Sequence, residues 1–225
     1  MKKQSGFTLI ELAIVLVIIG LLLGGVLKGQ ELINSAKVKN MIADFKNSQV
    51  YIYGYQDRFR ALPGDDPNAA ANLGAAASPV SGNGNGQIAG AWNAGTNGTA
   101  PAVESGNFWQ HVRLAGLAPG PTDLTNANYY PTNADGGRIG IQSLATGAGF
   151  PGPTGTAALS GSFVICSAAI LGRFARQIDT TMDDGNTATG SVRVYADAAP
   201  TVWVTSTGET PTIIDNNTYN VCMAF

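Results

Sequence analysis

The sequence predicts an α+β protein in which one long N-terminal helix carries a head built on a small antiparallel sheet. No proline interrupts residues 7–62, and an apolar run fills the first part of that stretch. Short β-rich segments between turn residues occur from residue 138 onward, as expected for an antiparallel sheet. A loop-rich region of glycine and asparagine, residues 64–160, separates the helix from most of these segments.

The composition argues against the commonest enzymes and against nucleic-acid binding. Charged residues make up 12% of the 225, about half the usual share, and the net charge is −2. No basic field is therefore available to attract nucleic acid. The chain has one histidine, His111, and two cysteines, which excludes a multi-Cys/His zinc site. We expect no enzyme, no cofactor and a structural or surface role for His111.

The first expected element is a membrane-spanning helix. Residues Phe7–Leu27 contain one charged residue, Glu11, and as a helix they would span roughly 30 Å, the thickness of a bilayer core. Lys2 and Lys3 precede this segment, so the N-terminus is expected on the cytoplasmic side. The segment lacks an A-x-A-like cleavage site after its apolar run, and we expect it to be retained.

Glu11 is unusual in this setting. An unpaired carboxylate in an apolar helix costs several kcal/mol. No basic side chain follows within two helical turns, so its partner is expected from another chain or from a free amine. A protonated acid, or one that reaches the membrane surface, is the alternative.

The N-terminal residues also carry a family resemblance. The stretch KKQSGFTLIELAIVLVIIG resembles the leader and mature start of type IV pilins and type II secretion pseudopilins. The resemblance implies a leader of residues 1–6, cleavage between Gly6 and Phe7 by a prepilin peptidase, and N-methylation of Phe7 by the same enzyme. It implies that Glu11 pairs with the N-terminal amine of a neighbouring subunit, and we expect Thr8 and Glu11 to act in assembly.

The resemblance also implies an organisation and a function. Residues 7–30 would form the transmembrane and polymerisation helix, and residues 31–225 a periplasmic or extracellular head that includes the second half of the long helix. The pilin-like chain would be a single-pass protein of the bacterial inner membrane, and then part of a type IV pilus. Its partners would be identical or related pilins, the prepilin peptidase and the inner-membrane assembly platform. A type II secretion pseudopilin and a membrane-anchored binding domain are the alternatives.

One difference from the family concerns the helix itself. Many members carry a kinking proline where this chain has Lys28. Here helix propensity is lowered instead by four glycines, each costing up to about 1 kcal/mol relative to alanine: Gly20, Gly24, Gly25 and Gly29.

Periodicity predicts the remaining helices. Beyond residue 31, apolar side chains recur at helical spacing, and the sequence Leu62-Pro63-Gly64 is expected to end the long helix. Two shorter amphipathic helices are expected at residues 104–117 and 167–182. The positions expected on one face of the long helix are Leu32, Ala36, Lys39/Asn40 and Ala43, together with Val38, Ile42, Phe45, Gln49 and Ile52.

Five short segments are predicted as strands. One face of their sheet is expected to pack on the long helix. The segments are Arg138–Leu144, Ser162–Cys166, Ser191–Tyr195, Val202–Thr205 and Tyr219–Met223.

The two cysteines lie in predicted strands. Cys166 and Cys222 are expected outside the cytoplasm, where disulfides form, and many type IV pilins have a C-terminal segment closed by a disulfide. We expect the two to be bonded, which would contribute about 4 kcal/mol on the chain-entropy model. Two buried free thiols are the alternative.

Three acids gather at the end of the helix predicted to reach Met182. Asp179, Asp183 and Asp184 would lie near a helix C-terminus, where negative charge is disfavoured. Arg173 and Arg176 on the preceding turns could compensate them. Calcium is a weaker possibility, since the spacing is not that of an EF-hand loop. We therefore expect a solvated acidic turn.

Overall fold

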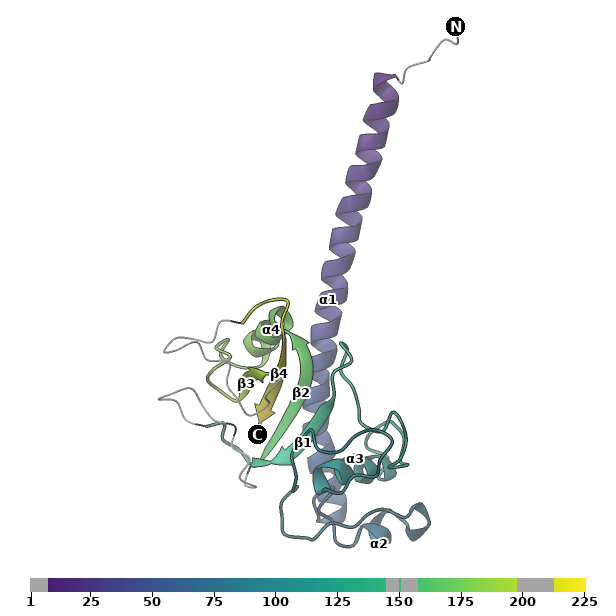
Figure 1. The fold of residues 1–225 in the computed structure, drawn as a ribbon, viewed down its shortest axis with the longest axis vertical. Coiled ribbons are helices and arrows are strands. Elements are labelled where there is room, and N and C mark those ends of the chain that lie inside the picture. The colour runs from purple at the N-terminus through teal and green to yellow at the C-terminus, as the bar shows by residue number, and fades with distance from the viewer. Residues whose placement is uncertain (1–7, 145–149, 151–157, 198–212) are drawn as a thin grey trace.

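The computed structural model describes residues 8–144, 150, 158–197 and 213–225. One helix, α1, spans Leu9–Phe59 and runs the length of the molecule, as Figure 1 shows. Arg60 adopts a left-handed conformation at φ 58°, and its N–H donates to the carbonyl of Gln56 over 2.9 Å. This cap ends the helix slightly before the predicted stop at Leu62-Pro63.

The second half of α1 is part of the head. The predicted positions Val38, Ile42, Phe45 and Ile52 are buried, which confirms that face. The prediction was wrong for Leu32, which is 62% exposed. It was also wrong for Ala36, Lys39, Asn40 and Ala43, which are exposed. Leu32 and Ala36 precede Val38, the first buried residue of α1, and the other three lie on the side of the helix that the head does not cover. The buried side chains of α1 are Val38, Met41, Ile42, Phe45, Ser48, Ile52 and Tyr55.

Among the residues that the structure describes, the sheet has four antiparallel strands in the order β1-β2-β4-β3. The last strand in the sequence is therefore inserted between β2 and β3. Four of the five predicted strands are confirmed with shifts at their ends, and the fifth, Val202–Thr205, lies outside the described residues. The strands are β1 (Ile139–Ser143), β2 (Phe163–Leu171), β3 (Val192–Ala196) and β4 (Thr218–Ala224).

The two faces of the sheet contribute to separate apolar clusters, since side chains alternate along each strand. One face, with Ile141, Ile165 and Val221, shares its core with α1, as predicted. The other face carries the two cysteines and packs under Trp92 and other loop residues.

Helix α4 spans Gly172–Met182, and the prediction that it starts near Ser167 was wrong. Strand β2 continues to Leu171 because it pairs with β4 again beyond a register shift between Ser167 and Ile170. Ile170 is fully buried, as the helical spacing predicted, but it lies at the end of strand β2 and not in a helix.

Helix α3 spans Glu104–Leu114 and confirms the helix predicted at residues 104–117. Two short helical segments were not predicted, namely α2 at Ala69–Leu73 and a 3₁₀ turn at Ala75–Ala77. In Figure 1, α2 and α3 lie near the C-terminal end of α1.

The glycine- and asparagine-rich loop wraps around buried acids that the sequence analysis missed. Asp65 is 3% exposed, and its carboxylate accepts the backbone N–H groups of Gly84, Asn85 and Gly86 at 2.7–3.1 Å. A Cβ atom at Gly82 would overlap the backbone of Asp65, so this approach requires glycine. Charge-assisted hydrogen bonds of this kind hold residues 84–86 in place although these residues belong to no helix or strand.

His111 is a structural residue. It is fully buried, its Nδ1 accepts the N–H of Gly64 over 2.9 Å, and its Nε2 lies 2.7 Å from the carbonyl of Val80. The ring therefore joins the end of α1 to the loop, and burial lowers its pKa.

Candidate assembly interface

The N-terminal half of α1 is an unpartnered apolar surface. Its most apolar stretch has no buried residue, and the helix is long and apolar enough to cross a membrane. Leu9 is 89% exposed and Leu27 is 67% exposed. In Figure 1 this half projects away from the sheet and the shorter helices. An apolar surface of this size requires lipid or other protein chains to cover it.

Thr8 and Glu11 form a capping box at the start of α1. The Thr8 backbone N–H donates to Glu11 Oε2 over 2.8 Å, and the Thr8 hydroxyl donates to the same oxygen over 2.7 Å. The Glu11 N–H donates in turn to the Thr8 hydroxyl over 3.3 Å.

This arrangement modifies the expectation that the partner of Glu11 comes only from outside its chain. Thr8 supplies two donors within the chain, and the Thr-x-x-Glu spacing is the sequence signal that predicts such a box. Both of these bonds use Oε2, so Oε1 has no hydrogen-bond donor among the residues that the structure describes. The carboxylate can therefore cap the helix and still accept a further donor.

The four glycines of α1 are not required by packing within the chain. A Cβ atom added at Gly20, Gly24, Gly25 or Gly29 would meet no described atom within 4 Å. Small residues let helix backbones approach closely in membranes. The glycines are therefore available for helix–helix contact or for local unwinding.

An ion pair marks where the head begins on α1. Lys37 Nζ lies 2.7 Å from Asp135 Oδ1, one position before the first buried residue of the helix. Lys28 instead pairs locally with Glu31, at an exposed position where such a pair contributes little. The boundary between free helix and head therefore lies near residue 37.

The disulfide joins the two central strands. Cys166 of β2 and Cys222 of β4 are directly opposite in the antiparallel register, with Cα atoms 4.1 Å apart, and both are fully buried. The structure therefore confirms the predicted pairing. Because β4 is the C-terminal strand, the bond fastens the end of the chain into the middle of the sheet.

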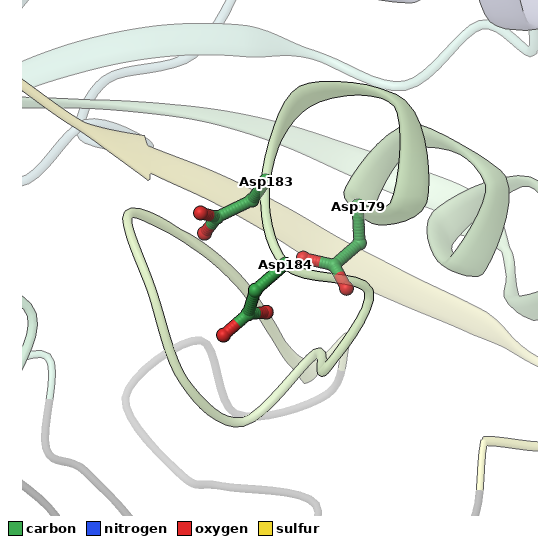
Figure 2. A group of neighbouring side chains, drawn as sticks. All are labelled: Asp179, Asp183 and Asp184. Carbon is green, nitrogen blue, oxygen red and sulfur yellow. The ribbon is translucent and has the colours of Figure 1, made fainter.

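The three acids at the end of α4 lie together, as Figure 2 shows. Asp179 is fully buried, Asp183 is half-buried and Asp184 is exposed, so the reading of a solvated turn was wrong for Asp179. Burial, together with the charges of Asp184 and Asp183, raises the pKa of Asp179 to about 7.

The arginines that were expected to compensate these acids bind elsewhere. Arg176 donates to the Ile213 carbonyl over 2.6 Å and pairs with Asp215. Arg173 donates to Asn216 over 3.2 Å. Both side chains therefore hold the segment before β4 against α4.

Comparison with known families identifies the N-terminal segment. Residues 1–27 match the model of the prokaryotic N-terminal methylation motif. The chain carries the leader signature of type IV pilins and pseudopilins. No curated protein and no solved structure matches the chain.

The signature and the fold agree. A long N-terminal helix on a small antiparallel sheet is the architecture of pilins, and the apolar helix with its leader indicates membrane anchoring. Proteins with this signature are structural, and the motif implies processing by a prepilin peptidase. Gly6 and Phe7, between which the cleavage is predicted, fall inside the matched residues but outside those that the structure describes.

Proposed function

We propose that this protein is a structural subunit of a type IV pilus, assembled from the inner membrane through α1. The observation that carries the proposal is the exposed apolar half of that helix, which directly follows a prepilin leader. Before assembly the bilayer covers this surface, with the N-terminus in the cytoplasm. After assembly the same surface packs against the helices of identical or related subunits, and the head faces outward.

In this proposal Glu11 sets the position of each new subunit. Cleavage after Gly6 creates a free amine at Phe7, and Oε1 of Glu11 is available to a neighbour's amine while Oε2 keeps the bonds to Thr8. A charge-assisted bond of this kind is strengthened where lipid or apolar side chains exclude water. Pairing therefore favours one axial register over others that bury the same apolar area.

The leader signature is common to pilins and to type II secretion pseudopilins, whose filaments stay short. We favour the pilus, and the assembly platform, the peptidase and other pilins are its proposed partners. A membrane-anchored binding domain is the alternative of a different class, and it needs neither cleavage after Gly6 nor an acid at position 11.

Two substitutions at one position test the role of Glu11. Glu11→Gln keeps an oxygen that can accept the Thr8 donors but removes the charge, whereas Glu11→Ala removes both. We expect processed, membrane-inserted protein and no sheared filaments from either variant. Glu31→Ala is the matched control, because it removes an exposed acid from the same helix, and it should assemble normally.

The outcomes separate the explanations. Normal filaments from Glu11→Gln but not from Glu11→Ala would mean that only the helix cap matters, and would contradict the pairing. Normal filaments from both variants would contradict any role of Glu11 in assembly. Protein that retains its leader in cells with an active prepilin peptidase would favour the simple anchor.

A further inference from the structure

The end of α4 holds a buried acid, Asp179. Asp179 is fully buried, and neither of its carboxylate oxygens has a hydrogen-bond partner among the residues that the structure describes. Nine-tenths or more of buried polar groups are normally paired, since an unpaired one costs free energy. The burial of an unpaired carboxylate at Asp179 therefore has to be explained, whereas an exposed acid would be solvated by water.

The side chain of Asp179 faces two further carboxylates. Figure 2 shows it pointing from the last turn of α4 toward the side where Asp183 and Asp184 lie. One oxygen from each of the three acids can be chosen so that all lie within 4.8 Å of one another. Calcium binds oxygen at about 2.3–2.6 Å, so opposite ligands lie about 4.6–5.2 Å apart. The three oxygens therefore fit around one such ion.

The two other acids are held in place by the loop that follows. Asp183 Oδ2 accepts the N–H of Val192 at the start of β3 over 2.8 Å. Asp184 accepts the N–H of Asn186 and the hydroxyl of Thr189 at 2.8 and 2.7 Å. These bonds orient both carboxylates but bring no positive charge to Asp179.

The charges around the cluster also favour a divalent cation. The arginines of α4 bind the segment near Asp215, and the charge of Arg193 acts on Asp184. When all three carboxylates are ionised, they and Arg193 leave two negative charges, which a divalent cation would neutralise. The C-terminal end of a helix attracts a cation as well.

We propose that Asp179, Asp183 and Asp184 bind one calcium ion at the C-terminal end of α4. Hard carboxylate oxygens match calcium, and the exposed side at Asp184 leaves room for water to complete the coordination. Bound calcium would fasten the end of α4 to the start of β3 through Asp183. The ion would thereby stabilise the edge of the head next to the disulfide-linked strands.

The test uses the full-length protein in non-ionic detergent, freed of calcium with EGTA. We expect the unfolding midpoint to rise by about 5–10 °C when calcium chloride reaches roughly 100 times its dissociation constant. Isothermal titration should give one ion per chain. Magnesium should shift the midpoint less, because it requires nearly ideal octahedral geometry.

Variants assign the effect to this site. Asp179→Asn should lose the calcium-dependent rise, and without calcium it should be at least as stable as the wild type because a buried charge is removed. Asp184→Asn changes an exposed position, where folding is not at risk, and should weaken binding by roughly tenfold or more. Asp57→Asn, an exposed acid on α1, is the matched control and should respond like the wild type.

Three results would overturn the proposal. The first is a wild-type midpoint that calcium does not change up to about 10 mM, beyond the range of extracellular modules. The second is an equal rise in Asp179→Asn and the wild type. The third is an equal response to magnesium, which would contradict the assignment to calcium.

Discussion

Removing the bond between Cys166 and Cys222 tests how far one covalent link stabilises the head. The two residues are 56 positions apart in the sequence. Closing a loop of that length lowers the entropy of the unfolded chain, which stabilises the folded state by about 4 kcal/mol at 25 °C. For a chain of 150–250 residues each kcal/mol shifts the midpoint by about 2–4 °C, so we expect a drop of about 8–16 °C.

The assay compares three forms of the full-length protein in detergent by circular dichroism. They are the oxidised wild type, the wild type refolded in reductant, and Cys166→Ala/Cys222→Ala. The reduced wild type keeps both sulfur atoms in the buried cluster, so the drop in its unfolding midpoint reports the covalent link alone. The double variant adds the cost of the missing side-chain atoms. Equal midpoints for oxidised and reduced wild type would refute the reasoning. Alkylation of both cysteines in unfolded, unreduced protein from cells would refute the bond itself.

Three further predictions concern processing and the head. Intact-mass analysis of membrane-extracted protein should give the mass of residues 7–225 plus one methyl group on Phe7, and an unprocessed mass would contradict the cleavage after Gly6. Because burial lowers the pKa of His111, the unfolded chain binds its proton more readily, and stability should fall by up to about 1.4 kcal/mol per pH unit as the pH drops below about 6.5. His111→Gln should flatten that part of the pH profile of the unfolding midpoint, and an unchanged profile would contradict this origin. Asp65→Ala removes the carboxylate that three loop N–H groups share and leaves the N–H of Gly86 without its acceptor, whereas those of Gly84 and Asn85 keep the backbone carbonyl of residue 65 and Asn83 Oδ1. It should cost about 1–3 kcal/mol in denaturant unfolding, and Asp57→Ala should cost almost nothing.

Much of the fold follows from periodicity. The long helix could be predicted because nothing in the sequence interrupts it before Pro63, and four strands because β-branched residues cluster between turn signals. The pairing of Cys166 with Cys222 required only that both lie outside the cytoplasm. These features depend on local composition and compartment, which a single sequence contains.

Other features depend on contacts between distant residues. The extension of β2 to Leu171 requires pairing with β4 beyond a register shift, so helical spacing alone misassigned its last residues. The acceptor role of Asp65 depends on a loop about 20 residues further along the chain. The bonds between Thr8 and Glu11 were predictable from their spacing, but they come from a neutral neighbour, whereas the charge of Glu11 indicated a charged partner.

The most direct test of the account is to locate the protein on the cell surface. Cells that produce it with an epitope in the head would be sheared, and the released filaments labelled with antibody and viewed by electron microscopy. The account predicts that filaments carry the label and disappear with Glu11→Gln. A protein that stays wholly in the membrane fraction while filaments form without it would contradict the proposed role as a pilus subunit.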